Sequence, residues 1–207
     1  MFEQGSDEWF AARLGKITSS KVSDVMAKTK SGPAATRKNY MMQLLCERLT
    51  GRREESFTSP AMQRGTDQEP IARSAYEIAT GSSVSETGFI IHPEYNFTGS
   101  SPDGLVCGDG LVEIKNPNTA QHIASIQSGS YDRRYYPQMQ HQLWVSDREW
   151  CDFVSFDDRL PDSLQLFIDR VYRSAEYISD MVDEILEFHG ELLKLELLML
   201  DRMEKSA

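Results

Sequence analysis

The sequence contains few cysteines, and they form no pattern in which they could act together. Its three cysteines, Cys46, Cys107 and Cys151, lie far apart and include no C-x-x-C pair. We therefore expect neither a disulfide framework nor a structural zinc site, and free thiols are typical of a reducing cytoplasm. The chain also lacks a basic and apolar leader and any run of about 18 apolar residues. We expect no secretory signal, no association with a membrane, and a cytoplasmic location.

An excess of positive charge is missing as well. The 207 residues include 22 Lys and Arg against 32 Asp and Glu, which gives a net charge of -10. This balance argues against a protein that coats nucleic acid through a broad basic face. The charge is uneven, because residues 1–64 have a net charge of +4, whereas 65–160 have -8 and 161–207 have -6. Either the charges are scattered by chance over a solvated surface, or a basic segment faces a polyanion and an acidic centre holds a metal ion.

The length suits one globular core. We predict a single domain, 1–207, made of a basic helical N-terminal part (1–64), a core (65–160) and a helical C-terminal extension (161–207). Helical periodicity and turn residues predict helices at 18–28, 37–50, 60–80 and 136–146. Runs of β-branched and aromatic residues predict strands at 83–92, 103–107, 111–115 and 149–156. This order predicts an α/β fold class with a small mixed central sheet flanked by helices.

The last part of the chain has a helical apolar pattern. From Asp162 onward, apolar side chains recur with a helical period. They are Leu164, Phe167, Ile168, Val171, Ala175, Ile178, Val182, Ile185 and Leu186. We predict a long C-terminal helical segment, either as one helix or as two joined at Gly190.

One predicted hairpin brings chemically active side chains together. In a strand, Glu113 and Lys115 point to the same face, because alternate residues share a face. With residues 108–110 as a three-residue loop, Leu105 lies opposite Glu113 and Asp103 lies opposite Lys115. Two carboxylates and one ammonium group then share a face.

Such a group of side chains suits the hydrolysis of a phosphodiester. Two carboxylates favour a hard divalent cation such as Mg²⁺, which polarises phosphoryl oxygens and acidifies bound water. A neighbouring lysine can orient or deprotonate that water, or neutralise charge that develops on the phosphate. The alternative is a surface hairpin whose Glu and Lys simply point into solvent.

The motifs around this hairpin resemble a known family. Pro102-Asp103 followed by Glu113-Ile114-Lys115 is similar to the PD-(D/E)xK nuclease signature. Four segments resemble, in the same order, motifs of the phage lambda exonuclease and YqaJ-type viral recombinase family, the alkaline exonucleases. These segments are 9–20, 65–69, 101–105 and 136–145.

The resemblance implies a PD-(D/E)xK restriction-endonuclease-like core and an activity. The family members are Mg²⁺-dependent exonucleases that digest one strand of linear double-stranded DNA from its 5′ end. The implied products are mononucleotides and a 3′ single-stranded tail for recombination by single-strand annealing. One or two Mg²⁺ ions are implied, with Mn²⁺ able to substitute. The implied partners are double-stranded DNA with a 5′-phosphorylated end, two further copies in a homotrimeric ring, and a single-strand annealing protein of the host bacterium or its phage.

The resemblance also assigns roles to residues. Asp103, Glu113, Glu69 and the Ile114 carbonyl match the metal ligands, and Lys115 matches the residue that acts on the attacking water. Gln138 matches a glutamine that supports the site, with Gln140 and Gln142 as further supporting residues.

A second set of residues matches the site for the 5′-phosphate. Arg13 and Ser20 are implied to bind it, with Thr18 beside them. The family usually has alanine where this chain has Ser19, so either Ser19 or Ser20 could contact the phosphate. The alternatives are helix capping for the hydroxyl groups and a surface ion pair for Arg13. His141 lies next to the glutamines, and we expect it to be exposed to solvent.

Two other functions remain open. One is another PD-(D/E)xK nuclease that processes DNA ends, of the Cas4-like or RecB-type kind. Members with an iron–sulfur cluster need four cysteines, which this chain lacks. The other is a non-catalytic subunit that binds DNA ends, and such a subunit would not need Lys115.

Overall fold

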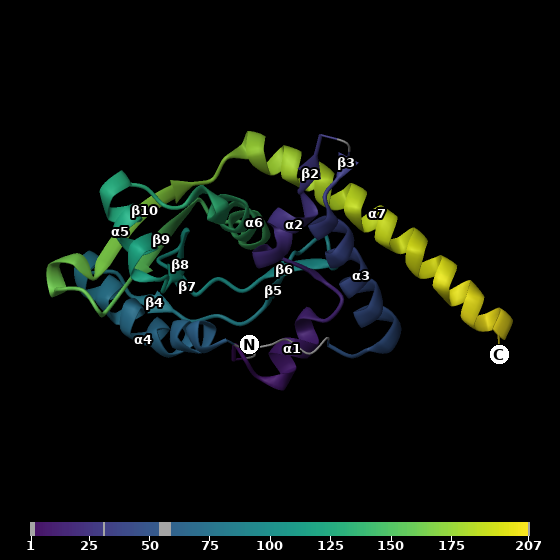
Figure 1. The fold of residues 1–207 in the computed structure, drawn as a ribbon, viewed down its shortest axis with the longest axis horizontal. Helices are drawn as coiled ribbons and strands as arrows, with labels where there is room; N and C mark the ends of the chain where they lie inside the picture. Colours follow the sequence, from purple (N-terminus) through teal and green to yellow (C-terminus); the bar gives the residue numbers. More distant parts are fainter. Residues whose placement is uncertain (1–2, 31, 54–58, 207) are drawn as a thin grey trace.

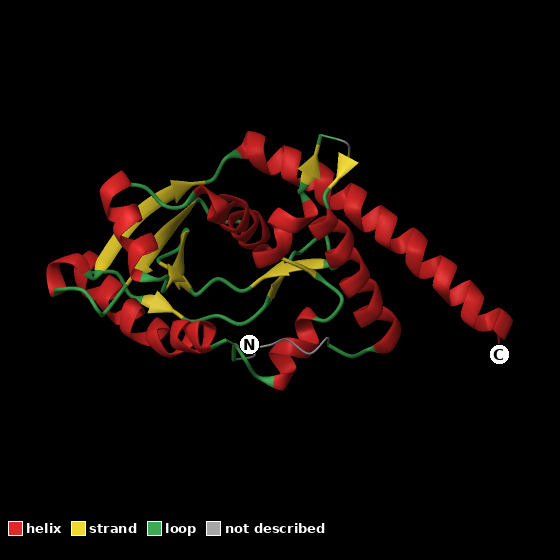
Figure 2. Ribbon diagram, in the orientation of Figure 1, coloured by secondary structure: helices red, strands yellow, loops and turns green. Residues whose placement is uncertain are grey.

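The structure is a computed structural model and describes residues 3–30, 32–53 and 59–206 (Figures 1 and 2). The first half contains α1 (Asp7–Arg13), β1 (Ile17–Thr18), the 3-10 turn η1 (Ser19–Lys21), α2 (Val22–Val25), β2 (Lys28–Thr29), β3 (Gly32–Pro33), α3 (Ala35–Thr50), α4 (Pro60–Thr80), β4 (Val84–Ser85), β5 (Ile90–Ile91) and β6 (Thr98–Ser100). The second half contains β7 (Gly104–Val106), β8 (Gly110–Lys115), α5 (Thr119–Ser128), η2 (Arg133–Tyr135), α6 (Tyr136–Ser146), β9 (Trp150–Phe156), η3 (Asp162–Leu164), β10 (Leu166–Tyr172) and α7 (Ala175–Ser206). None of the helices in these ranges is both long enough and apolar enough to cross a lipid bilayer.

A five-stranded mixed sheet forms the centre of the fold. Its strand order is β10-β9-β8-β7-β4, in which β8 and β9 run parallel and the other neighbours run antiparallel. On one face, Val112 and Ile114 of β8 pack with Ala72 and Tyr76 of α4. On the other face, Leu111 packs with residues of α6. Glu113 and Lys115 share the face of Leu111, so they point to the side that α6 covers. The mixed central sheet flanked by helices confirms the predicted fold class.

A second core joins the N-terminal part to the C-terminal helix. A small sheet of order β1-β6-β5 lies beside helices α2, α3 and α7 (Figure 1). Its apolar cluster includes Ile17, Leu44, Ile185 and Phe188, all at most 2% exposed. The later turns of α7 extend past this cluster, away from the body of the molecule.

The C-terminal prediction was wrong in its first part. Residues 166–172 form β10, the edge strand that pairs with β9, where a helix was predicted from residue 162. The same apolar residues suit a half-buried strand. The backbone of residues 166–172 pairs with the edge of β9 that β8 does not occupy, and this pairing with a distant segment decides in favour of a strand. The helical extension therefore begins at Ala175 rather than near 161, and it continues through Gly190 as one helix.

The register of the hairpin also differs from the prediction. Val106 pairs with Gly110 and Leu105 with Leu111, so the loop is 107–109. Gly110 lies inside β8, at a position that requires glycine because a Cβ atom there would overlap the indole ring of Trp150. Cys107 instead adopts the left-handed conformation, with φ of 51°. This shift keeps Asp103 on the face of Glu113, because it changes the pairing by an even number of residues.

Candidate active site

Glu113 is the buried centre of the site. Its side chain is 1% exposed, and both of its oxygens accept hydrogen bonds. Gln138 Nε2 donates to Oε1 at 2.5 Å, and Gln142 Nε2 donates to Oε2 at 2.5 Å. Lys115 Nζ forms an ion pair with Oε1. The two glutamines are four residues apart on α6, so both face β8 and fix the position of this carboxylate.

Asp103 lies at the start of the same hairpin. Its Oδ2 accepts a hydrogen bond of 2.6 Å from the Ile114 N–H, which holds the carboxylate beside Glu113. Burial and the charge of Glu113 raise the pKa of Asp103 well above its usual range, although Lys115 opposes this shift. Burial lowers the pKa of Lys115, but Glu113 and Asp103 outweigh it and raise that pKa above its usual value. Lys115 therefore stays protonated.

Glu69 faces the same charges from α4. Its Oε1 accepts a hydrogen bond of 2.8 Å from Arg73 Nη2, and Arg73 also forms an ion pair with Glu86. Burial raises the pKa of Glu69, and the charge of Glu113 adds to this effect. Glu69 and Asp103 line one cavity of about 740 Å³. The three carboxylates thus come from three different elements.

These oxygen atoms suit a hard divalent cation. When both are ionised, Asp103 and Glu113 bring two negative charges to the single ammonium group of Lys115, and after burial the charge of Glu113 is the main cause of the raised pKa of Asp103. Within the described ranges, no group of three or more His, Cys, Asp or Glu side chains could hold a metal ion. A divalent cation would therefore be held by two carboxylates, Asp103 and Glu113, and the carbonyl of Ile114 and Glu69 stay predicted ligands.

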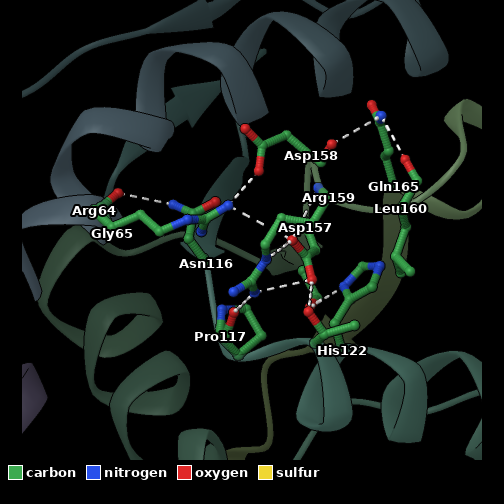
Figure 3. A network of polar contacts seen from close by, with 12 residues as sticks. Arg64, Gly65, Asn116, Pro117, His122, Asp157, Asp158, Arg159, Leu160 and Gln165 are labelled. Carbon is green, nitrogen blue, oxygen red and sulfur yellow. Dashed lines mark hydrogen bonds and ion pairs between the residues drawn. The ribbon is translucent and has the colours of Figure 1, made fainter. Parts of the chain in front are cut away.

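A separate polar network holds α4 against the end of β8 (Figure 3). Asn116 Nδ2 donates to the carbonyl of Gly65 at 2.9 Å. Arg64 forms ion pairs with Asp157 and Asp158, which follow β9. This network fixes the turn of α4 that precedes Glu69.

Arg13, the last residue of α1, contacts the segment that contains Asp103. Its Nη1 donates to Ser101 Oγ at 3.1 Å, and Trp9 Nε1 donates to the same oxygen at 2.9 Å. The guanidinium carbon is 4.0 Å from the centre of the Trp9 ring. Burial lowers the pKa of Arg13 to about 10, so the group remains charged at neutral pH.

A basic cavity opens beside Arg13. It has a volume of about 310 Å³, and its cationic lining residues are Arg13, Lys16, Lys21 and Arg53. Glu47 also lines it, and its Oε2 accepts a hydrogen bond from the Gly15 N–H. Trp9, Phe10 and Arg53 line both this cavity and the one beside Asp103 and Glu69. The two cavities are therefore neighbours, with these three side chains between them.

His141 separates the roles of Ser19 and Ser20. The His141 ring is 0% exposed, with Nδ1 2.8 Å from Ser19 Oγ and Nε2 2.9 Å from Thr98 Oγ1. Thr98 donates its hydroxyl proton to the Ile17 carbonyl, so it accepts from Nε2–H. Nδ1 must then accept the proton of Ser19. The predicted exposure of His141 was wrong, because the hydroxyl groups of Ser19 in η1 and Thr98 in β6 satisfy its ring inside the core.

The predicted phosphate residues consequently divide into two kinds. Ser19 is buried and its proton is engaged, whereas Ser20 is exposed and lines the basic cavity with Arg13. Thr18 also lines the cavity, but its side chain makes no capping hydrogen bond.

The glutamines of α6 divide as well. Gln140 points away from Glu113, donates to the carbonyl of Tyr172 and accepts from the N–H of Ser174. Gln142, by contrast, contacts Glu113 directly. Ser101 and Trp9 were not singled out as site residues, although both lie within the motifs that carried the resemblance.

A mixed sheet with this hairpin and this cluster of charges defines the PD-(D/E)xK nuclease fold. Within that class, the model of the YqaJ-like viral recombinase domain matches residues 8–149, more than half of the chain. The chain belongs to this family.

The similar proteins agree with that assignment. An alkaline exonuclease from Laribacter hongkongensis, solved alone and in complex with dAMP, is 48% identical, with a TM-score of 0.91. The match covers 98% of this chain and 100% of that one. A phage-related exonuclease from Haemophilus somnus 129PT has 16% identity and a TM-score of 0.67 over 91% of this chain and 96% of that one, which shows a shared fold. An uncharacterised protein of Acanthamoeba polyphaga mimivirus is 24% identical over 81% of this chain. The matched region covers only 31% of that protein's length.

Proposed function

We propose that this protein is a Mg²⁺-dependent exonuclease that digests one strand of linear double-stranded DNA in the 5′→3′ direction. The proposal is carried by the position of the basic cavity of Arg13 and Ser20, which shares three lining residues with the cavity of Asp103 and Glu69. A terminal 5′-phosphate in the basic cavity would put the next phosphodiester beside the carboxylates. The products would be mononucleotides and a 3′ single-stranded tail.

The side chains have distinct roles in this reaction. Gln138 and Gln142 hold Glu113, and the Ile114 N–H holds Asp103, so both carboxylates are positioned before substrate arrives. When bound, Mg²⁺ supplies an electrophile for a phosphoryl oxygen and acidifies a water molecule, and Mn²⁺ would substitute for it. The protonated Lys115 orients the attacking water or neutralises charge that develops on the phosphate.

Arg13 and Ser20 would select the end of the strand. Ser101, two residues before Asp103, accepts a hydrogen bond from the guanidinium of Arg13, and this contact would set the spacing between the terminal phosphate and the cleaved bond. Charge-assisted hydrogen bonds from arginine to phosphate are strong and directional. A duplex with a 5′-phosphorylated end is therefore the proposed substrate.

The assembly and the partners are also proposals. The end of α7 exposes Leu193, Leu197, Leu198, Leu200 and Met203, and this apolar surface supports contacts between subunits of a homotrimeric ring. A ring around the DNA would keep the enzyme on its substrate, and a single-strand annealing protein would take over the 3′ tail. The three cysteines, all free thiols, suit the reducing cytoplasm of a bacterium.

Digestion of end-labelled duplex tests this function. We expect Mg²⁺-dependent release of labelled mononucleotide from a 5′-labelled strand, early in the reaction, and its abolition by EDTA. A 3′ label should be released only late. Early release of the 3′ label, or full activity in EDTA, would contradict the proposal.

Arg13→Ala tests the phosphate site separately. We expect this variant to digest 5′-phosphorylated ends roughly 10- to 100-fold more slowly, because a hydrogen bond to a charged group contributes about 1.5–3 kcal/mol. The digestion of 5′-hydroxyl ends should slow much less. Equal slowing of both ends would count against this role of Arg13.

A further inference from the structure

A third cavity has Lys115 in its lining. It has a volume of about 260 Å³ and lies between α5 and η2, beside strands β8 and β9. Lys115 forms one end of it, and Tyr131, Tyr135 and Phe153 contribute aromatic rings. The sequence motifs that indicated the nuclease do not include these aromatic residues.

The lining of this cavity is flat and mostly apolar. The ring centres of Tyr131 and Tyr135 lie 6.0 and 5.5 Å from that of Phe153. Lys115 Nζ is 5.4 Å from the centre of the Tyr135 ring. Polar groups occur at the rim, where Gln121 and Ser128 of α5 are exposed. The rings of Tyr131 and Tyr135 are tilted by 47° and 31° against Phe153, which is buried beneath them. Half-buried tyrosine rings with a few polar groups and a neighbouring cation suit a nucleobase that follows a phosphate.

The order of the strands places this cavity opposite the basic one. In the sheet, β9 and β7 flank β8 on opposite sides. The cavity beside Lys115 is lined by Phe153 and Ser155 of β9, whereas Asp103, next to β7, lines the cavity that neighbours the one of Arg13. A strand whose 5′-phosphate binds near Arg13 must therefore leave the acidic cluster on the side of Lys115.

We propose that this cavity binds the base of the nucleotide on the 3′ side of the cleaved phosphodiester. This inference rests on the proposed function, because the polarity of the strand decides which nucleotide reaches Lys115. The cavity would hold the second base of the strand in place while the first nucleotide is released, independently of base identity.

Removal of one base from the DNA tests the proposal. The rate to measure is release of the 5′-terminal nucleotide in a single turnover, with enzyme in excess. An abasic site at the second nucleotide of the digested strand should slow this release roughly tenfold, because one stacked base contributes about 1–3 kcal/mol. An abasic site opposite it, in the complementary strand, should not slow release, because it removes the base pair and leaves the stacked base.

Protein variants identify the cavity. In Tyr131→Leu, release from intact DNA should slow to a similar degree, and the abasic site at the second nucleotide should add no further loss. Tyr172→Leu, an exposed tyrosine on β10, is the matched control and should respond as the wild type does. Ala124→Trp, at the rim on α5, should fill the cavity and remove the effect of the abasic site without loss of an aromatic core contact.

The outcomes separate this inference from the proposed function. If intact DNA loses no 5′-terminal nucleotide, the proposed function fails. If intact and abasic DNA are digested at the same rate, or if Tyr131→Leu and Ala124→Trp leave the abasic effect unchanged, only the inference about this cavity is overturned.

Discussion

Two aspartates of this protein, the buried Asp157 and the half-buried Asp103, have opposite surroundings. Asp157, 0% exposed, accepts hydrogen bonds from Thr119 at 2.6 Å and from Arg159 Nε at 2.6 Å, with Arg64 Nη2 at 3.6 Å. Burial raises its pKa, but the hydrogen bonds from Arg159 and Thr119 outweigh burial and lower it to about 2. Asp103 faces Glu113 and Glu69, and its pKa is raised well above the usual range.

The comparison shows that neighbouring charges, and not burial alone, set the state of a carboxylate. The negative charge of Asp157 is paired with Arg64 and Arg159 of the same chain, so this network has a structural role (Figure 3). The cluster of Asp103 has more negative than positive charge, which destabilises the free protein and favours the binding of a cation.

The largest expected effect is the difference in nuclease activity between variants of Asp103 and variants of Asp157. We expect Asp103→Ala and Lys115→Ala to reduce nucleotide release by at least about 1,000-fold while the fold stays intact, because the positioned charges act on the transition state. Asp157→Asn should retain most of the activity at temperatures where it is folded. Circular dichroism checks the fold, and substantial release by either alanine variant would sink the assignment.

The pH dependence of Mg²⁺ binding should follow the raised pKa of Asp103. A carboxyl group with a raised pKa keeps its proton to higher pH, and Mg²⁺ must displace that proton. The affinity should therefore increase with pH, by up to about tenfold per pH unit while one proton is released for each ion bound. Titration calorimetry at several pH values measures this slope, and an affinity that does not depend on pH would contradict the prediction.

Asp157→Asn should act on stability instead. We expect it to lower the free energy of unfolding at neutral pH by about 1.5–3 kcal/mol, the contribution of a hydrogen bond to a charged group. Because the pKa of Asp157 is lowered in the folded state, its contribution is complete above the unfolded value near 3.8 and declines as pH falls toward 2. Urea unfolding should show the difference from wild type shrinking over that range. A constant difference would mean that ionisation of Asp157 is not involved.

Two substitutions of His141 should produce the smallest effect, a change of several-fold in preference for phosphorylated ends. Asparagine places its amide near the position of Nδ1 and can keep the contact with Ser19, whereas glutamine reaches the position of Nε2 and Thr98. We expect His141→Gln to lose more of the preference than His141→Asn, because only the latter keeps the segment of Ser20 in place. The ratio of rates on 5′-phosphate and 5′-hydroxyl ends is the readout. An equal loss in both variants would favour a general packing role for His141.

Much of the site was accessible from the sequence, because strand alternation is a local property. Alternate residues put Glu113 and Lys115 on one face whatever the loop is, and an error of two residues in the hairpin register left Asp103 on that face. The helical and strand-like patterns around them also predicted the mixed sheet correctly.

The helix predicted at 18–28 was wrong except for α2, because its ends lie in β1, η1 and β2. The errors at β10 and His141 concern interactions between distant segments. β10 has apolar residues that fit a helix, and only the pairing with β9 makes it a strand. The burial of His141 depends on Ser19 and Thr98, which are 122 and 43 residues away in sequence. The network of Asp157 joins α4, α5 and the end of β9, and no spacing of residue types indicates it.

Direct titration of Mg²⁺ into three proteins tests the central claim, that the unbalanced cluster of Asp103 and not the balanced network of Asp157 takes the cation. The proteins are the wild type, Asp103→Asn and Asp157→Asn, all at a pH where Asp103 is ionised. We predict binding to the wild type and to Asp157→Asn with similar affinity, and its loss in Asp103→Asn. Equal binding by all three proteins would contradict the account.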